Sequence, residues 1–374
     1  MKIIAKFAGG ANDGGKPFGA LVADKAGALY GATSVGGNDN KGIIFKLTPK
    51  ANPNALWTKT ILHEFGGATG ETPYAGLVID NAGNLYGTTT AGGTNNKGVV
   101  FKYTAATKQL TVLYSFKGNA TDGGMPYAGL ARDADGVLYG FTSEGGRSGF
   151  GTAFEIAANN RFTVTHHFTG ASGDNPRGAP VLDKQGNVYG ASVEGGGPKN
   201  GLVFKIAPNN ARTTLYTFKA AASDGHHPYG PLFTPGGNGA MFFGTTNEGG
   251  AQNKGAIFEV MPPSTGMMIH AFTGASGANP FGGVVADSRT ILYGTAFGGG
   301  ARDKGVVFKL IPPANSQPAW THELMYSFRG GTVDGANPYA GVLLGKNSTL
   351  YGTTSAGGGG ACTGGCGNAF KVTY

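Results

Sequence analysis

Short apolar segments separated by turn-forming residues run through the whole chain and indicate its fold. The stretch that begins at Pro73 is representative, because its apolar, β-branched and aromatic residues fall into four groups. These groups are Pro73 to Asp80, Asn84 to Thr90, Gly98 to Tyr103 and Leu110 to Phe116. Such runs, bounded by Gly, Asn and Asp, are typical of β-strands, and a proline suits the first residue of a strand. The pattern predicts four short antiparallel strands.

The same four-segment unit recurs along the chain with a period of about fifty residues. Its seven copies begin at the prolines numbered 17, 73, 126, 176, 228, 280 and 338. A period of this length indicates repeated supersecondary units that share one continuous core. Four-stranded antiparallel units arranged around an axis are the blades of a β-propeller. We therefore predict an all-β fold, a seven-bladed β-propeller with four antiparallel strands per blade, as a single domain over residues 1–374.

The two ends of the sequence complement each other. The seventh copy stops after its third strand, Asn368 to Thr373, and its fourth strand is missing. Met1 to Phe7 matches the fourth-strand pattern that Leu113 to Phe116 displays in another copy. We expect residues 1–9 to complete the seventh blade, because ring closure removes the free sheet edges. Met1 to Phe7 is too short for a secretion signal, so we expect any leader to lie outside this numbering.

The repeated unit also resembles a known family. Leu85-Tyr86-Gly87-Thr88-Thr89, then Gly92-Gly93, then Lys97 to Lys102 is similar to the GloVer tandem repeat of bacterial exported and surface proteins. The resemblance covers essentially the whole chain. It implies an exported repeat protein, in an extracellular or periplasmic location, and it brings no reaction and no catalytic residues.

Composition and charge narrow the classes of partner. Lys and Arg number 29 against 21 Asp and Glu, a net charge of +8 that favours anionic partners. No apolar run is long enough to span a bilayer, and no nucleic-acid motif, metal site or cofactor motif is recognisable. We expect no cofactor and no metal, with a divalent metal at the loop aspartates left open as an alternative, and we expect a monomer. Cys362 and Cys366 lie in a glycine-rich loop, where we favour a disulfide over two free thiols.

Two loops of each unit carry repeated polar residues and are expected on one face of the propeller. One holds Asp-Gly-type sequences with Asp13, Asp122, Asp174, Asp224 and Asp334. The other holds a lysine before a glycine, as Lys41, Lys97, Lys254 and Lys304. Loops on a rigid scaffold are where binding usually lies, so we expect a ligand face there. The alternative is that the aspartates cap turns and the lysines are merely solvated.

Departures from the repeat single out blades three to five. Glu144, Glu194 and Glu248 precede the Gly-Gly pair where other copies have apolar residues. The aromatic that follows each repeat proline becomes Arg177 in blade four, and His226-His227 precede the proline of blade five. Carboxylates, an arginine and histidines on one arc suit a sugar acid and supply acid and base groups. The alternative is a surface pair of Glu194 with Arg177 and solvent-exposed histidines.

Aromatic residues offer a second kind of contact. Those after the repeat prolines are expected near the mouth of the central channel, at Phe18, Tyr74, Tyr127, Tyr229, Phe281 and Tyr339. Tyr74, Tyr127 and Tyr339 are candidate stacking surfaces for sugar rings, although packing under the loops is an equal alternative. His63, His166 and His270 occupy a fourth-strand position held by tyrosine in other copies, and we expect them to be structural.

Three functions compete at this point. We favour an exported carbohydrate-binding protein that engages glycans, preferably anionic ones, on the loop face. The alternative is a polysaccharide lyase or glycoside hydrolase, in which Arg177 neutralises a uronate and His226, His227 or Tyr229 moves a proton. A protein-interaction scaffold is the third. Convergence of Arg177, Glu194 and the two histidines in one concavity would favour the enzyme.

Overall fold

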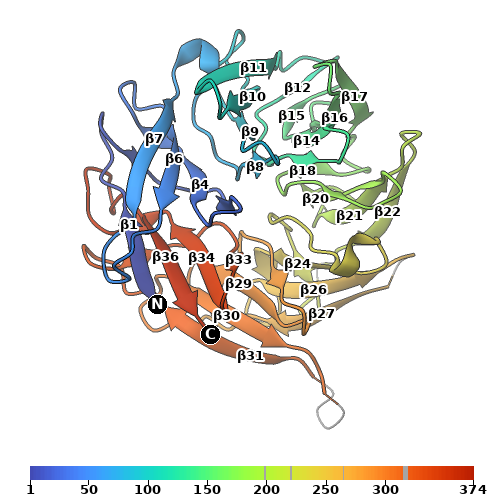
Figure 1. The fold of residues 1–374 in the computed structure, drawn as a ribbon. Helices are drawn as coiled ribbons and strands as arrows, with labels where there is room; N and C mark the ends of the chain where they lie inside the picture. The colour runs from blue at the N-terminus through green and yellow to red at the C-terminus, as the bar shows by residue number, and fades with distance from the viewer. Residues whose placement is uncertain (198, 220, 264, 315–318) are drawn as a thin grey trace.

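The structure is a computed structural model that describes residues 1–197, 199–219, 221–263, 265–314 and 319–374. Seven antiparallel sheets stand around a central axis, and the two chain ends lie together in one blade (Figure 1). The predicted seven-bladed β-propeller is confirmed. No α-helix occurs among the described residues, only the 3-10 turns η1 (Gly67–Thr69) and η2 (Pro235–Gly237), and no helix there has the length and apolar character to cross a membrane.

Each blade is ordered from the axis outwards. Blade one consists of β3 (Val22–Ala23), β4 (Leu29–Thr33), β6 (Ile43–Thr48) and β7 (Thr58–Glu64). Blade two consists of β8 (Val78–Ile79), β9 (Leu85–Thr89), β10 (Val99–Thr104) and β11 (Gln109–Ser115). Blade three consists of β13 (Ala131–Arg132), β14 (Leu138–Thr142), β16 (Thr152–Ile156) and β17 (Phe162–His167). Blade four consists of β19 (Val181–Leu182), β20 (Val188–Glu194), β21 (Leu202–Ile206) and β22 (Arg212–Thr217). Blade five consists of β24 (Phe242–Thr246), β26 (Ala256–Met261) and β27 (Thr265–Ala271). Blade six consists of β28 (Val285–Ala286), β29 (Leu292–Ala296), β30 (Val306–Ile311) and β31 (Thr321–Ser327). Blade seven consists of β33 (Leu343–Gly345), β34 (Thr349–Thr354), β36 (Asn368–Thr373) and β1 (Lys2–Lys6).

The innermost strand is much shorter than the sequence pattern predicts. Pro73 to Asp80 was expected to be one strand, and only Val78–Ile79 pairs. The proline has no N–H to give to a ladder. The inner segments of neighbouring blades also crowd together: a Cβ on Gly19 would lie 2.4 Å from the carbonyl oxygen of Ala75. In blade five the inner strand is reduced to one bridge between Phe233 and Phe243.

The terminal strand closes the ring as expected. β1 pairs antiparallel with β36, with Lys2 opposite Lys371 and Lys6 opposite Asn368. The strand order in blade seven is β1-β36-β34-β33, so residues from the start of the chain form its outer edge.

A phenylalanine pair joins every blade to the next. The fourth-strand Phe of one blade packs edge-on against the third-strand Phe of its neighbour, with ring centroids 5.1 Å apart for Phe65 and Phe101. The other pairs are Phe7–Phe45, Phe116–Phe154, Phe168–Phe204, Phe218–Phe258, Phe272–Phe308 and Phe328–Phe370. These rings are almost fully buried, and each such pair contributes about 0.5–1.5 kcal/mol beyond its buried area. The hydrophobic core is thus a ring of blade interfaces.

The two polar loops of each unit do share one face, because they pair with each other. The short strands are β2 (Gly14–Gly15) with β5 (Val35–Gly36), β12 (Gly123–Gly124) with β15 (Glu144–Gly145), β18 (Asp174–Pro176) with β20, β23 (Gly225–His226) with β25 (Glu248–Gly249), and β32 (Gly335–Ala336) with β35 (Ala356–Gly357). Single bridges, Glu71–Ala91 and Ala278–Gly298, do the same in blades two and six. We call this side of the propeller the loop face.

A backbone clasp on the loop face ties each blade to the one before it. The residue before each repeat proline donates its N–H across the blade boundary, and Met125 donates to the carbonyl oxygen of Lys97 at 2.9 Å. These donors have φ between 51° and 58°, the left-handed region, although none is glycine: they are Lys16, Thr72, Met125, Asn175, His227, Asn279 and Asn337. The clasp imposes this conformation whatever side chain is present, at a cost of order 1–3 kcal/mol each.

Candidate functional site

The seven residues that follow the repeat prolines line one central cavity of about 240 Å³. They are Phe18, Tyr74, Tyr127, Arg177, Tyr229, Phe281 and Tyr339. All seven side chains are half-buried, so they are in contact with each other and also reach solvent. Small residues such as Gly76, Gly178 and Gly283 form part of the wall behind them, which leaves room inside the ring.

These side chains touch one another around the complete circle. Phe18 stacks on Tyr74 with ring centroids 4.3 Å apart. Phe281 stacks on Tyr339 at 4.6 Å, and the two stacks meet where Phe18 and Tyr339 approach edge-on at 5.2 Å. Tyr127 and Tyr229 continue the circle on either side, each edge-on to its aromatic neighbour. The tyrosines therefore pack against each other and also line an open cavity.

Arg177 closes the circle between the last two tyrosines. Its guanidinium carbon lies 4.3 Å from the ring centroid of Tyr127 and 5.5 Å from that of Tyr229. Its Nε donates to Oδ1 of Asn175 at 3.0 Å, and among the described residues no carboxylate forms an ion pair with it. The expected alternative of a surface pair with Glu194 is therefore not present. The cavity contains one cation held by cation–π contacts and facing no anion.

Two phenols of the cavity, those of Tyr74 and Tyr339, have raised pKa values. Burial raises the pKa of Tyr339, and it also raises the pKa of Tyr74, where the positive charge of Arg177 acts in the opposite direction. A hydroxyl with a raised pKa is a hydrogen-bond donor and a poor general base.

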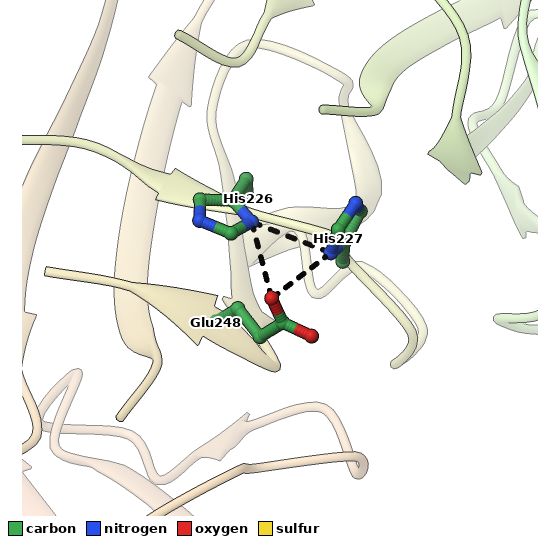
Figure 2. A group of neighbouring side chains, drawn as sticks. All are labelled: His226, His227 and Glu248. Carbon is green, nitrogen blue, oxygen red and sulfur yellow. Dashed lines mark hydrogen bonds and ion pairs between the residues drawn. The ribbon is translucent and has the colours of Figure 1, made fainter. Parts of the chain in front are cut away.

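His226, His227 and Glu248 converge on the loop face of blade five (Figure 2). Nδ1 of His226 and Nδ1 of His227 are 3.3 Å apart. Oε2 of Glu248 lies 3.8 Å from the first nitrogen and 3.5 Å from the second. Burial lowers the pKa of His226, and the charge of neighbouring His227 lowers it further while Glu248 opposes the shift. These three residues are not among those that line the central cavity.

The other two carboxylates of the arc have different surroundings. Glu144 is exposed and accepts from Nζ of Lys97 at 3.3 Å. Glu194 is exposed and lies directly opposite Asp174 in the β18–β20 pair. Burial raises the pKa of Asp174, and the negative charge of Glu194 raises it further. The arc therefore divides into an ion pair, a carboxylate pair and the histidine cluster.

The repeated lysines contribute their backbone to the clasp. Lys41, Lys97, Lys254 and Lys304 each accept a clasp bond on their carbonyl oxygen. Lys41 also pairs with Glu71 of the next blade at 2.7 Å, so its charge and that of Lys97 are neutralised locally. Lys254 and Lys304 are exposed, and among the described residues neither has a carboxylate partner.

The repeated aspartates are turn caps, with one correction. Asp122, Asp224 and Asp334 are buried and accept backbone N–H groups of their own loops. Asp174 does not belong to this set, because it stands two residues before its proline and the others stand four before theirs. The loop of blade four is two residues shorter, which places Ser172 at the capping position instead.

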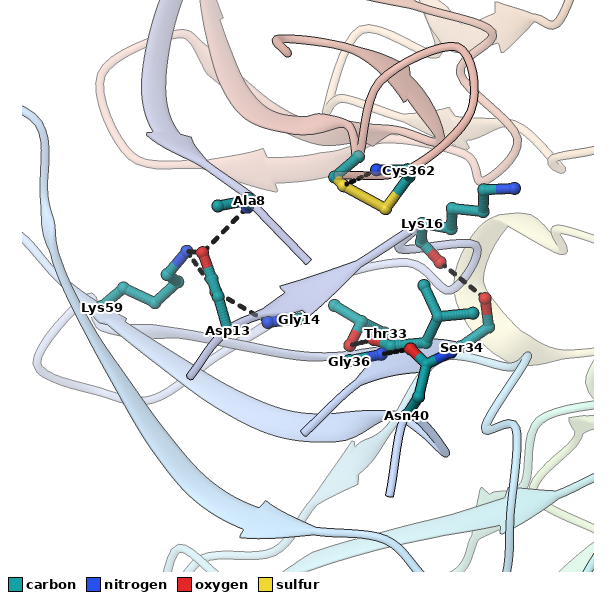
Figure 3. The surroundings of a disulfide bond; sticks show 12 residues. Ala8, Asp13, Gly14, Lys16, Thr33, Ser34, Gly36, Asn40, Lys59 and Cys362 are labelled. Carbon is teal, nitrogen blue, oxygen red and sulfur yellow. Dashed lines mark hydrogen bonds and ion pairs between the residues drawn. A yellow bond between two sulfur atoms is a disulfide. The ribbon is translucent and has the colours of Figure 1, made fainter. Parts of the chain in front are cut away.

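The predicted disulfide is formed between Cys362 and Cys366, at the junction of blades seven and one (Figure 3). The carbonyl oxygen of Cys366 accepts the clasp bond from Lys16 at 2.8 Å, at the place where four other blades have a lysine. Ala361 donates to the carbonyl oxygen of Ala8 at 2.8 Å. The disulfide loop therefore contacts the segment that follows the closing strand.

The proposed sites of the sequence thus separate into two places. Arg177 and Tyr229 line the central cavity together with Tyr74, Tyr127 and Tyr339. Glu194, His226 and His227 do not line it, so the convergence that would favour an enzyme is not observed. The candidate residues from the sequence did not include Phe18 and Phe281, which also line the cavity, although their place in the aromatic column was visible. It also missed Asn175, which orients Arg177 and which no sequence signal distinguishes from other loop asparagines.

Known structures share the propeller fold at low identity. Virginiamycin B lyase from Staphylococcus aureus has a TM-score of 0.62 at 10% identity, covering 100% of this chain and 99% of that one. A GH74 enzyme from Niastella koreensis has a TM-score of 0.53 at 18% identity, covering 86% and 47%. At these identities the likeness shows the fold alone. Comparison with curated proteins found no match.

The family assignment rests on the repeat itself. The model of the Gloeobacter/Verrucomicrobia repeat matches residues 1–183 and 158–370, which is nearly the whole chain. This agrees with the resemblance carried by the Leu-Tyr-Gly, Gly-Gly and Lys-Gly motifs. The chain therefore belongs to the Gloeobacter/Verrucomicrobia repeat family.

Proposed function

We propose that this propeller binds acidic carbohydrates at the central cavity, with the carboxylate of a sugar acid paired to Arg177. The observation that carries the proposal is the single guanidinium in a cavity otherwise ringed by aromatic side chains. Its contacts are the faces of Tyr127 and Tyr229 and one amide oxygen, which leave its other N–H donors for a ligand. A guanidinium fork matches a carboxylate in a bidentate arrangement.

The aromatic ring supports the carbohydrate part of the ligand. Half-buried phenols offer apolar area to the C–H faces of a sugar and hydroxyls to its oxygens. The cavity volume of about 240 Å³ lies below the roughly 300–1,000 Å³ of drug-sized sites. It therefore suits one sugar residue, such as a chain end or a branch. The exposed Lys254 and Lys304 and the net charge of +8 would attract the rest of an anionic chain to the loop face.

The lyase or hydrolase alternative has less support. A uronate held by Arg177 would need a base beside it, and neither His226 nor His227 lines the cavity. The tyrosines with shifted pKa values in the ring, Tyr74 and Tyr339, are shifted away from the deprotonated state. A protein-interaction scaffold would leave the cavity chemistry without a role. An extracellular or periplasmic location fits the disulfide, because such bonds persist in oxidising compartments.

The proposal is tested by calorimetric titration of the protein with oligosaccharides of glucuronate or galacturonate and with their neutral counterparts. Arg177→Gln removes the cation and should weaken binding of the acidic set by about 10- to 100-fold, the equivalent of roughly 1.5–3 kcal/mol for a charged hydrogen bond. Arg177→Tyr restores the aromatic of other blades and should shift preference towards the neutral set. Arg147→Gln, an exposed arginine in the blade-three loop, is the matched control for net charge and should leave affinity unchanged.

Two results would count against this function. Equal affinity for acidic and neutral sugars, or acidic binding that neither added salt nor Arg177→Gln weakens, would remove the electrostatic basis. New unsaturated uronate ends during incubation with a polysaccharide would instead favour the enzyme alternative. If no sugar binds at all, the scaffold alternative remains.

A further inference from the structure

We propose that His226, His227 and Glu248 form a binding site for a divalent transition-metal ion, with Zn²⁺ as the best match, on the loop face of blade five. The three side chains present their ligand atoms to a common point (Figure 2). Two imidazoles and one carboxylate are a donor set that suits Zn²⁺ and neighbouring ions of the first transition row. The site is separate from the central cavity, so it does not depend on the carbohydrate proposal.

The spacing of the ligand atoms fits tetrahedral coordination. Bonds of about 2.0–2.1 Å at tetrahedral angles place two ligand atoms about 3.3–3.4 Å apart. The observed separations are 3.3 Å between the two Nδ1 atoms and 3.5 and 3.8 Å from these atoms to Oε2 of Glu248. The triangle is thus one face of a slightly open tetrahedron, and a metal at its centre leaves a fourth position for water or another ligand.

Hydrogen bonding alone accounts poorly for this arrangement. The two His–Glu separations of 3.5 and 3.8 Å are longer than the 2.7–3.2 Å of a normal N–H···O bond. The two Nδ1 atoms face each other, although only one of them at a time can use a proton between them. A hydrogen bond between the two imidazoles leaves the Glu248 carboxylate without a normal hydrogen bond to either ring, whereas a metal ion would contact all three groups.

The propeller supplies the geometry that brings two consecutive histidines to one side. Neighbouring residues of an extended strand point to opposite faces, which would separate their imidazoles. His227 is instead held at φ 58° by the clasp, through its N–H to the carbonyl oxygen of Asn200 at 2.9 Å. The two rings then lie nearly perpendicular with centroids 4.8 Å apart. His226 is directly opposite Glu248 in the β23–β25 pair, which fixes the third ligand.

Blade five alone has this ligand set, and the other blades supply matched replacements. At the position of His226, blades six and seven have Ala278 and Ala336. At the position of His227, blades four, six and seven have asparagine at the same positive φ. At the position of Glu248, blades two and seven have Ala91 and Ala356. Each ligand can thus be removed by a residue that the fold already accommodates at that place.

The test uses the untagged full chain after treatment with a chelator and its removal. Isothermal titration with Zn²⁺, combined with elemental analysis of the dialysed complex, should give one equivalent bound. Co²⁺ should give the intense visible absorption of a tetrahedral centre, whereas Mg²⁺ and Ca²⁺ should not bind because they prefer oxygen ligands. The melting temperature should rise with free Zn²⁺ concentration, because the ion binds the folded state.

His226→Ala, His227→Asn and Glu248→Ala should each weaken Zn²⁺ binding by about tenfold or more. Glu194→Ala, which changes the equivalent carboxylate of blade four, is the control and should leave affinity unchanged. Circular dichroism and melting of the metal-free variants establish that each folds. Substoichiometric Zn²⁺ binding by the wild type, or binding of one equivalent that survives all three substitutions, would overturn the assignment.

Discussion

The hydroxyl of Tyr114 donates to Oδ2 of Asp122 across 2.9 Å, joining the end of a fourth strand to the loop that follows it. The same carboxylate accepts the backbone N–H of Lys117 at 2.9 Å and, on its other oxygen, that of Gly123 at 2.6 Å. Tyr216–Asp224 and Tyr326–Asp334 repeat the pair with separations of 2.8 and 2.9 Å. The repeated aspartate thus fixes the loop face, and ligands are not needed to explain it.

Asp122→Ala should lower the free energy of unfolding by about 2–3 kcal/mol, because three hydrogen-bond donors lose a buried charged acceptor. Urea denaturation followed by circular dichroism measures the change. Asp135→Ala, at an exposed turn position of the same blade, is the control and should change stability by less than about 0.5 kcal/mol. Equal effects of the two substitutions would contradict the structural role.

Histidine replaces the tyrosine where the following loop is shorter. His166 Nε2 lies 3.4 Å from Ser172 Oγ, in the position of the Tyr–Asp pair of other blades. Pro176 is eight positions after Phe168, whereas Pro126 is ten positions after Phe116. The shorter loop thus brings a serine, and not an aspartate, to the aromatic side chain.

These histidines should make the propeller acid-sensitive. Burial lowers the pKa of His166 and of His270 to about 4, with smaller contributions from Arg212 and His322 respectively. The unfolded chain, with an ordinary His pKa near 6.5, takes up protons first, so stability is complete above about pH 6.5 and declines as the pH falls to about 4. We expect a loss of about 1–3 kcal/mol across this window, after allowance for their remaining solvent contact.

Melting temperatures measured from pH 7 to pH 4 test this dependence. The double variant His166→Phe/His270→Phe keeps an aromatic ring at both positions and removes both titrating groups. Its stability should fall less steeply with acid than that of the wild type. Parallel curves for the two proteins would show that other groups control the response.

Deletion of residues 1–9 should destabilise the whole ring, because it exposes the outer edge of β36 and removes the Phe7–Phe45 contact. Thermal unfolding should shift to lower temperature, and the protein should associate more readily through the free edge. Addition of a synthetic peptide of residues 1–9 should partly reverse both effects. An unchanged melting curve would contradict closure by β1.

The double variant Cys362→Ser/Cys366→Ser should have a free energy of unfolding about 2 kcal/mol lower than that of the wild type. The decrease is small for a disulfide because this one joins cysteines only four positions apart. Stability is compared with and without a reducing agent. Reduction should lower the wild type to the level of the variant and leave the variant unaffected. A reducing agent that destabilises the variant equally would act elsewhere.

Much of this architecture is readable from the sequence because the repeat encodes it seven times. The strands β9, β10 and β11 begin and end within about two residues of the predicted segments, and closure by β1 follows from the missing fourth strand. The predicted length of the inner strand was wrong, because crowding around the axis arises only in the assembled ring and leaves no signal in the local sequence.

The candidate sites were readable only in part. Arg177 was visible because it departs from an aromatic column, but its contacts with Tyr127 and Tyr229 depend on how blades three to five meet. The histidine cluster depends on the left-handed backbone of His227, and the equivalent residues include lysine, threonine, methionine and asparagine. The type of side chain does not predict that backbone conformation, because the clasp imposes it.

The pairing of Lys2 with Lys371 joins two parts of the chain that are almost as far apart in sequence as any can be. We expect such a contact to form late in folding, because closing a very long loop costs chain entropy before the strand pairing stabilises the fold. Until β1 docks, the edge of β36 is free, and β1 from a second molecule satisfies it equally well. A low protein concentration therefore favours closure within one chain. A high protein concentration favours the exchange of β1 between copies, which links one propeller to the next.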